Sequence, residues 1–323
     1  MKNKNIFITR EIPGDGIKLL KDKGYKVTVS KKKRPLTKAK LVTAMSKKKY
    51  VAMISLLNDH IDAEVFDVCP TLKVVANYTV GFNNIDVEEA TKRGIRVTNT
   101  RGTSALAVAE HAVALMMAVS MRVVEGDRLV RKGKYKGWDP ELLMGLDLHH
   151  KTIGIIGAGA IGQEVSHILH RGFACKILYT DIKRNEKIES GHNATFTSME
   201  NLLKESDIIS IHVPLMKETH HLINSEKIHL MKKTAVLINT SRGAVIDEKA
   251  LVHALQNNII WGAGLDVFEN EPEMTEGLAK LNNVVLTPHI ASSRPSARNE
   301  MSELAAKNII SFIETGAVIT PVN

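Results

Sequence analysis

The sequence predicts an α/β protein made of two doubly wound parallel-sheet domains with a cleft between them. Short β-rich runs alternate with helical segments along the chain, which indicates βα units around parallel sheets. The 323 residues are enough for two domains, and 44% hydrophobic with 24% charged residues is ordinary for a globular protein. A glycine-spaced turn between a strand and a helix near residue 157 points to a dinucleotide-binding unit.

The first five β-rich runs lie in the N-terminal third of the chain. They cover residues 6–9, 25–29, 51–55, 73–77 and 96–99. Helices are expected over 61–68 and 87–94, and the second ends on a glycine suited to a helix C-terminus. This region carries no phosphate-binding fingerprint.

One long helix is predicted over residues 104–132, where Ala, Val, Leu and Met recur at helical spacing. A turn-rich linker follows, and then six strand candidates cover residues 151–156, 175–180, 208–213, 235–240, 261–266 and 284–289. A last helix over 296–314 is long enough to return to the first domain. We therefore expect residues 1–102 and 290–323 to form one domain and residues 103–289 the other.

The turn after the sixth strand run has the spacing of a dinucleotide site. Gly157 permits a tight turn, Gly159 lets the backbone approach a pyrophosphate, and Gly162 allows helix and strand to pack closely. The helix N-terminus offers N–H groups to the phosphates. An acid about 20 residues on is expected to bind the adenosine ribose. The predicted cofactor-binding residues of this Rossmann-type motif are Gly157, Gly159, Ala160, Ile161, Gly162 and Asp181.

Three side chains with usable chemistry follow consecutive strand runs, at the sheet edge where ligands bind in open parallel sheets. The planar fork of Arg242 can bind a carboxylate, His289 can donate a proton, and Glu271 can keep that donor charged. Taken singly, Arg242 could be a surface cation, His289 a helix-cap or core imidazole, and Glu271 an exposed loop acid. Six other histidines lack such a position after a strand and are interpreted as structural or exposed: His111, His149, His150, His212, His220 and His221.

Composition argues against several other classes. The net charge is +9, but the basic runs at 31–34 and 47–49 have few aromatic neighbours, so they are interpreted as solvated and no nucleic-acid partner is expected. Cys69 and Cys175 lie outside any metal-ligand spacing, which predicts neither a disulfide framework nor a metal site. The apolar run 105–121 is interpreted as a buried helix rather than a membrane span. With no export signal visible, we expect a cytoplasmic protein.

Together these motifs resemble the NAD(P)-dependent D-2-hydroxyacid dehydrogenase family over nearly the full chain, and most of all its glyoxylate/hydroxypyruvate reductase branch. The segments that carry the resemblance are 157–181, 241–248, 263–272 and 287–292, with 77–86 and 90–99 similar to that branch's substrate loop and following strand. The resemblance implies a flavodoxin-like substrate domain beside the Rossmann-type NAD domain. It also implies a homodimer formed through the long helical region.

The resemblance assigns roles residue by residue. It implies that Arg242 binds the substrate carboxylate, that His289 is the acid/base, and that Glu271 is its partner. The substrate also meets the backbone N–H groups of Val80 and Gly81, and Leu57 lines the pocket. The residues that the resemblance places around the cofactor are Val213, Pro214, Thr240 and Asp266.

Several alternatives stay open at this point. The Asp181 carboxylate would repel the 2′-phosphate of NADP, so NAD is expected, although Lys183 and Arg184 keep NADP as an alternative. Arg101 and Arg294 depart from the family pattern and could reach an anionic substrate tail or lie on the surface. The activity could instead be that of a D-3-phosphoglycerate dehydrogenase or a reductase for a bulkier 2-oxo acid. An NAD-sensing corepressor is the alternative outside enzymes.

Overall fold

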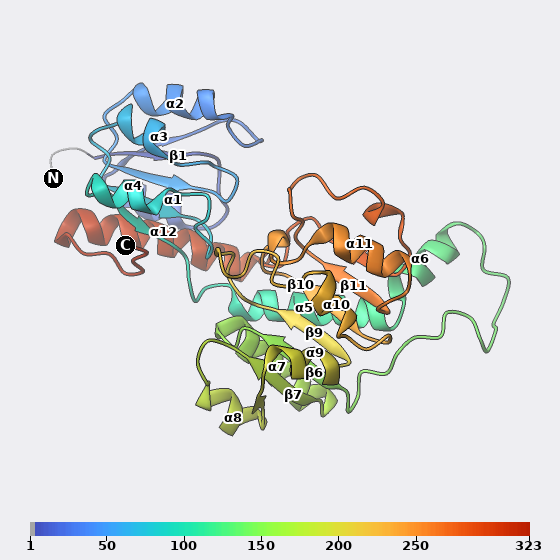
Figure 1. Ribbon diagram of the computed structural model, residues 1–323. Coiled ribbons are helices and arrows are strands. Elements are labelled where there is room, and N and C mark those ends of the chain that lie inside the picture. Colours follow the sequence, from blue (N-terminus) through green and yellow to red (C-terminus); the bar gives the residue numbers. More distant parts are fainter. Residues whose placement is uncertain (1–3) are drawn as a thin grey trace. The chain divides into compact units, whose positions relative to one another are not determined.

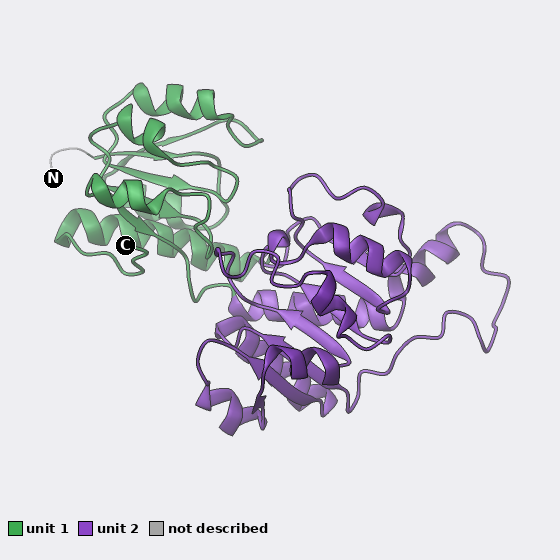
Figure 2. Ribbon diagram, in the orientation of Figure 1, with its two compact units in different colours: residues 1–104, 293–323 green, residues 105–292 purple. Residues whose placement is uncertain are grey.

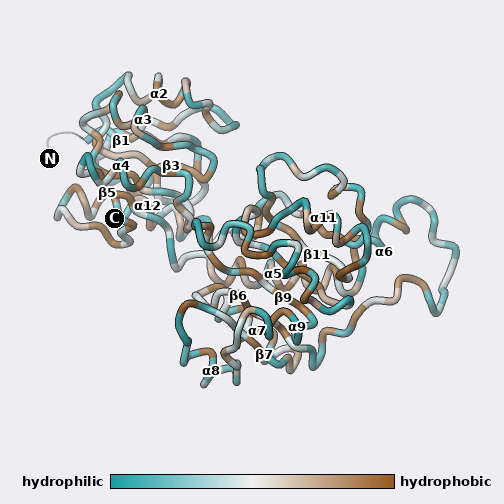
Figure 3. The backbone as a smooth tube through the Cα atoms, in the orientation of Figure 1, coloured by the Kyte–Doolittle hydropathy of each residue, from teal (hydrophilic) through white to brown (hydrophobic). Residues whose placement is uncertain are grey.

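A computed structural model describes residues 4–323 (Figure 1). The chain forms two compact units, each with its own sheet (Figure 2). Unit 1 contains the described residues up to Ser104 together with Ser293–Asn323, and unit 2 is Ala105–Ser292. Many of the strands are hydrophobic along their length (Figure 3), and the helices contribute buried apolar side chains to the core of each unit.

The sheet of unit 1 is fully parallel, with strand order β2-β1-β3-β4-β5. Its strands are β1 (Asn5–Ile8), β2 (Lys26–Val29), β3 (Ala52–Ser55), β4 (Val74–Asn77) and β5 (Arg96–Thr98). Every residue of β3 and β4 is buried, as expected for central strands with both faces covered. One face packs on α1 (Gly16–Asp22) and α12 (Pro295–Thr315). The other face packs on α2 (Lys38–Ser46), α3 (Ala63–Asp67) and α4 (Val87–Lys92).

The sheet of unit 2 is parallel and seven-stranded, in the order β12-β11-β10-β9-β6-β7-β8. The strands are β6 (Thr152–Ile156), β7 (Lys176–Thr180), β8 (Thr195–Phe196), β9 (Ile208–Ile211), β10 (Val236–Asn239), β11 (Gly262–Leu265) and β12 (Val284–Leu286). The six predicted strands are all present. The edge strand β8 was missed because its two residues are exposed and give no apolar run.

Helices cover both faces of this second sheet. One face packs on α5 (Ala105–Ser120), α7 (Ala160–Phe173) and α8 (Glu186–His192). The other packs on α9 (Met199–Glu205), α10 (Ser225–His229) and α11 (Glu248–Gln256). Short 3₁₀ turns lie at Gly243–Val245 and Leu278–Lys280.

The prediction of a single helix over 104–132 is wrong, because the helix is interrupted at Arg122. Helix α5 ends at Ser120, and α6 (Val123–Arg131) continues at an angle of 62°. A backbone dihedral angle and a hydrogen bond explain the break. Arg122 has a left-handed φ of 54°, and the Ser120 carbonyl, near the helix end, accepts a hydrogen bond from the Leu146 N–H at 2.8 Å. Helix α5 is buried in the core of unit 2, whereas α6 has no buried residue.

Among residues 4–323, no single helix is both long enough and apolar enough to span a membrane. The bent pair of α5 and α6 meets that test only by combined length and composition. The apolar side chains of α5 pack against β10, β11 and α7 in the core of unit 2.

Candidate active site

The turn between β6 and α7 has the geometry that a dinucleotide requires. Gly157 has a φ of 94°, and a Cβ there would lie 2.8 Å from the His212 backbone. A Cβ at Gly162 would lie 2.2 Å from the Gly157 carbonyl oxygen. A Cβ at Gly159 would meet no described atom within 4 Å, so packing within the protein does not require glycine there. The open space in front of the α7 N-terminus fits the close approach of a pyrophosphate.

Asp181 lies at the end of β7 and is hydrogen-bonded to this turn. Its carboxylate accepts the N–H of Ala158 at 2.7 Å and that of Ile182 at 2.6 Å. The nearby Arg184 guanidinium forms two 3.0 Å hydrogen bonds to Glu189. A carboxylate therefore stands at the expected ribose position, and the cation of Arg184 is already paired with another acid.

Arg242 follows β10 at the start of a tight turn. A Cβ at Gly243 would lie 1.9 Å from the carbonyl carbon of Phe268, so only glycine lets this turn lie against the segment that carries Glu271. The Arg242 guanidinium donates to the Ser241 carbonyl at 2.7 Å. Burial lowers the pKa of Arg242 from its ordinary value, and the charge of Glu271 opposes that shift. The arginine is thus held in a partly desolvated position near an acid.

Glu271 and His289 form a direct pair. The Nδ1 atom of His289 lies 2.9 Å from Oε2 of Glu271, and the two side chains are 27% and 25% exposed. The other oxygen of Glu271 accepts the Phe268 N–H at 3.1 Å. Because Nδ1–H donates to the carboxylate, Nε2 is the ring atom left to act on a substrate. The structure thus joins two of the three predicted catalytic side chains, Glu271 and His289, by a direct hydrogen bond. The negative charge of Glu271 also acts to raise the pKa of the third, Arg242.

Asp266 is fully buried and organises the segment that carries His289. Its carboxylate accepts the Thr287 hydroxyl at 2.6 Å and the N–H groups of Ile290 and Ala291 at 2.9 and 2.8 Å. Burial acts to raise its pKa, but hydrogen bonds from His111, Thr287 and these N–H groups outweigh burial and lower the pKa. The His289 N–H also donates to the Asp266 carbonyl. These bonds hold His289 in the left-handed region, with φ 54°.

His111 is a contributor that the sequence did not single out. Thr287 gives its hydroxyl proton to Asp266, so its oxygen accepts from Nε2 of His111 at 3.0 Å. The interpretation of His111 as merely structural or exposed missed this link to the His289 segment. No sequence signal could have shown it, because His111 lies inside an apolar helix and meets Thr287 only after α5 packs under the sheet.

The other predicted cofactor positions lie at the carboxyl ends of β9 and β10. Val213 is half-buried and Pro214 exposed. Thr240 is buried, and its hydroxyl has no hydrogen-bond partner among residues 4–323. In that same part of the chain, no group of three or more His, Cys, Asp or Glu residues is arranged to hold a metal.

In unit 1 the predicted substrate residues follow β3 and β4. Leu57 is half-buried after β3, and Val80 and Gly81 lie just beyond β4. Within residues 4–323, neither the Val80 N–H nor the Gly81 N–H donates to a protein acceptor. Arg101 and Arg294 are both exposed.

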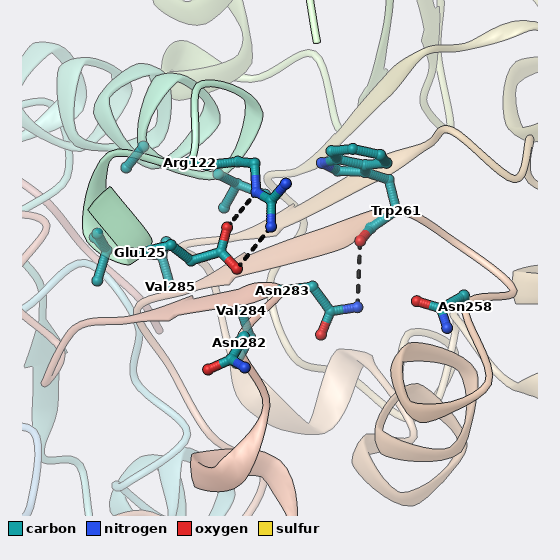
Figure 4. Close-up of a pocket in the computed structure, with 11 residues that line it drawn as sticks. Arg122, Glu125, Asn258, Trp261, Asn282, Asn283, Val284 and Val285 are labelled. Atoms are coloured by element: carbon teal, nitrogen blue, oxygen red, sulfur yellow. Dashed lines mark hydrogen bonds and ion pairs between the residues drawn. The ribbon is translucent and has the colours of Figure 1, made fainter. Parts of the chain in front are cut away.

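A well-formed hollow lies away from these residues. A cavity of about 240 Å³ opens at the amino ends of β11 and β12, lined by Arg122, Trp261 and Asn283 among others (Figure 4). The Arg122 guanidinium is paired there with Glu125. None of the predicted site residues lines this cavity, which lies at the sheet edge opposite Asp266 and Thr287.

Comparison with known proteins gives a consistent result. Residues 113–291 match the NAD binding domain of the D-isomer specific 2-hydroxyacid dehydrogenases. The chain is 50% identical to the glyoxylate reductase of Pyrococcus horikoshii over 97% of this chain and 93% of that protein. A Thermus thermophilus crystal structure is 41% identical with a TM-score of 0.92, covering 99% of this chain and 100% of that one. The NADPH-dependent glyoxylate/hydroxypyruvate reductase of Sinorhizobium meliloti is 30% identical with a TM-score of 0.86, covering 99% and 97%.

Proposed function

Because the chain belongs to the D-isomer specific 2-hydroxyacid dehydrogenase family, we propose that it reduces glyoxylate, and the related hydroxypyruvate, with NADH. Family membership makes it an NAD-dependent oxidoreductase acting on a small molecule. The observation that carries the substrate proposal is the His289–Glu271 pair, with Arg242 following a neighbouring strand of the same sheet. This set supplies a proton donor, its anionic partner and a carboxylate binder, which are the groups that reduction of a 2-oxo acid needs.

Each of these residues has a defined task in the proposed reaction. Bound NADH supplies the hydride that adds to C2 of the substrate. The Arg242 guanidinium binds the substrate carboxylate through paired hydrogen bonds. Nε2 of His289 donates its proton to the carbonyl oxygen, and Glu271 stabilises the protonated ring through Nδ1. The N–H groups of Val80 and Gly81 also receive the substrate carboxylate.

The cofactor and pocket roles are assigned in the same way. Leu57 lines the substrate pocket. The turn of Gly157, Gly159 and Gly162, with the first helical residues Ala160 and Ile161, holds the pyrophosphate. The ribose is bound by Asp181, and the nicotinamide end is bordered by Val213, Pro214, Thr240 and Asp266.

The proposal favours NADH over NADPH. A 2′-phosphate would face the Asp181 carboxylate, and Arg184 is already held by Glu189. We therefore expect a kcat/KM at least tenfold higher with NADH. The Sinorhizobium meliloti relative is described as NADPH-dependent, which makes cofactor choice a property to measure in this chain.

A single NADH-oxidation assay tests this function. The purified protein is given glyoxylate, hydroxypyruvate, pyruvate, 3-phosphohydroxypyruvate and a bulkier 2-oxo acid, each with NADH and with NADPH. The proposal expects the highest kcat/KM with glyoxylate or hydroxypyruvate. Preference for the phosphorylated or the bulkier acid would replace the substrate assignment. Tight NADH binding without reduction of any acid would instead support an NAD-sensing protein.

We also propose that the protein is a homodimer that acts in the cytoplasm. Helix α6 has no buried residue, and the segment after it exposes Trp138 at 84% and Met144 at 65%. Apolar surface of this kind is typical of a protein interface. The two cysteines are free, which fits a reducing compartment. Sedimentation velocity should give twice the 35.6 kDa chain mass, and Trp138→Glu should shift it toward the monomer. Cell fractionation tests the location.

A further inference from the structure

We infer that Asn99 and Asn77 are positioning residues that orient the peptide groups of residues 79–82 to bind the substrate carboxylate. The inference rests on the proposed function and deepens it, because it identifies how unit 1 would build an anion site from backbone N–H groups. It concerns three consecutive peptide groups that join residues 79 to 82.

The carbonyl oxygens of all three peptide groups are held from within unit 1. Thr79 O accepts the Thr100 N–H at 3.0 Å. Val80 O accepts Nδ2 of Asn99 at 2.7 Å. Gly81 O accepts Nδ2 of Asn77 at 2.9 Å. Two of the three anchors are therefore side-chain amides rather than backbone groups.

Peptide geometry then fixes the direction of the donors. In a trans peptide the carbonyl and the following N–H point in opposite directions. The one cis bond found in the described chain is Glu271–Pro272, so the bonds between 79 and 82 are trans. The N–H groups of Val80, Gly81 and Phe82 consequently point away from their anchors. Within residues 4–323 none of the three donates to a protein acceptor. Successive free N–H groups are a known way to bind an anion.

The two asparagines are themselves fixed in place. Asn77 is fully buried, and its Oδ1 accepts the Ser55 hydroxyl at 2.9 Å. Asn99 is 7% exposed, and its backbone carbonyl accepts the Thr320 hydroxyl at 2.6 Å. A buried side-chain amide that cannot rotate can hold a peptide plane in one orientation, whereas a solvent-exposed amide would rotate freely.

A third buried asparagine links this segment to the one that carries Leu57. Asn84 accepts Nδ2 of Asn77 at 2.9 Å and donates to the carbonyls of Leu56 and Asp59 at 3.1 and 3.0 Å. Both substrate-facing segments of unit 1 are therefore held by the same buried amide network. Because Asn84 supports both loops, replacing it would change the stability of the fold and the geometry of the site at once. Asn99 is therefore the better residue to replace.

The decisive variant is Asn99→Leu, because leucine branches at the same carbon but cannot donate to Val80 O. We expect the KM for glyoxylate to rise about tenfold and the dissociation constant of oxalate, a dicarboxylate probe, to rise by the same factor. We expect kcat to change less than about threefold and NADH affinity to stay unchanged, since neither depends on these peptide groups. Oxalate binding is measured by calorimetry with NADH present, which requires no turnover.

The matched control is Asn283→Leu in unit 2. The side-chain amide of Asn283 donates to the Leu255 carbonyl at 3.1 Å and to the Trp261 carbonyl at 3.2 Å, and Figure 4 shows the second of these bonds. This control should lower the unfolding temperature and leave KM and oxalate binding unchanged. If Asn99→Leu fails to fold, Asn99→Ala is measured in its place.

Four outcomes decide the inference. Unchanged oxalate affinity in the Asn99 variant would overturn it, as would an equal loss in the Asn283 control, because that would indicate general loosening. A wild-type protein that reduces no 2-oxo acid yet loses oxalate affinity on Asn99→Leu would reject the proposed function and leave the anion site standing. Absence of oxalate binding by the wild type would overturn the inference.

Discussion

The two units have the same kind of parallel sheet but different chemistry at the carboxyl ends of their strands. In unit 2 the ends carry charged side chains, with Arg242 after β10 and His289 after β12. In unit 1 the ends of β4 and β5 carry the uncharged amides of Asn77 and Asn99, and within residues 4–323 the N–H groups of residues 80–82 donate to no protein acceptor. With the roles proposed above, the same fold pattern would offer an anion formal charges in unit 2 and oriented peptide dipoles in unit 1.

The two ways of binding an anion, with a charged side chain or with backbone N–H groups, differ in what they require of the protein. A partly desolvated guanidinium is destabilised in its charged form, and burial accordingly lowers the pKa of Arg242 while Glu271 opposes the shift. Peptide dipoles carry no net charge, so the peptide groups of unit 1 need no counter-ion. They need instead the buried side-chain amides that hold the carbonyls of Val80 and Gly81 in place. We therefore expect removal of a side chain to have a large effect in unit 2 and a small one in unit 1, where the donor belongs to the backbone.

The largest effect is expected for Arg242→Ala. Removing the guanidinium deprives the substrate carboxylate of its charged partner, and truncating one member of such a pair costs about 2–5 kcal/mol. We expect kcat/KM for glyoxylate to fall roughly a thousandfold, with NADH affinity retained. Steady-state kinetics and NADH fluorescence titration measure the two quantities. Arg242→Lys should recover only part of the loss, because an ammonium cannot form the paired bonds. Wild-type kinetics in the alanine variant would exclude Arg242 as the carboxylate binder.

A smaller but still large effect is expected for Asp266→Asn. The amide keeps only one acceptor oxygen, so an N–H of Ile290 or Ala291, or the Thr287 hydroxyl, loses its bond. The His289 segment is then less well held, and we expect kcat to fall about tenfold to a hundredfold. The free energy of unfolding at pH 7 should fall by about 1–3 kcal/mol, because a buried polar group loses its partner. A stable variant with unchanged kcat would show that this carboxylate does not position His289.

The same variant has a pH signature. The pKa of Asp266 lies below its ordinary value of 3.8 in the folded state, so its ionised form stabilises the fold above that pH and the contribution disappears as pH falls. The stability difference between wild type and Asp266→Asn should therefore be full at pH 7 and shrink below about pH 4. Urea unfolding at several pH values measures it. A difference that is constant down to acid pH would indicate that the charge plays no part.

Glu271→Gln comes next. Glutamine keeps the shape but removes the negative charge 2.9 Å from Nδ1 of His289, so the protonated ring loses stabilisation. Reduction needs a proton donor at Nε2 of His289, so we expect kcat for glyoxylate about tenfold lower at pH 7. Steady-state kinetics measure the loss. Glu269→Gln is the matched control, because Glu269 pairs with His221 at the same 2.9 Å in the neighbouring loop and should leave kcat unchanged.

The contrast between the units also explains what the sequence could predict. The alternation of strands and helices was visible because parallel strands buried on both faces form apolar runs, and the predicted fold class and family are confirmed. Residues such as Gly157 and Asp181 have a spacing that follows from the geometry of a dinucleotide, with the pyrophosphate at the glycine turn and the ribose at the acid. The binding roles of these residues, and the catalytic roles of Arg242, Glu271 and His289, stay predictions.

What the sequence could not predict depends on contacts between distant segments. His111 meets Thr287 across 176 positions, and nothing in the apolar helix around it marks that contact. Asn99 and Asn77 look like ordinary polar residues at strand ends, since their role lies in which carbonyl each one holds. The break at Arg122 was missed because the composition stays helical through it, and the competing bond from Leu146 comes from a returning segment.

The smallest effect is expected for Val80→Ala, and it is the sharpest test of the contrast between units. Val80 has 38% of its surface exposed, and its proposed contribution is a backbone N–H that alanine retains. The carbonyl that orients the following N–H is held by Asn99 in either variant. We therefore expect kcat/KM for glyoxylate to change less than about threefold, against the thousandfold loss of kcat/KM expected for Arg242→Ala. A loss above tenfold in the same steady-state assay would mean that the valine side chain itself contacts the substrate. Unit 1 would then bind through side chains as unit 2 does, and the difference drawn between the two sheets would be wrong.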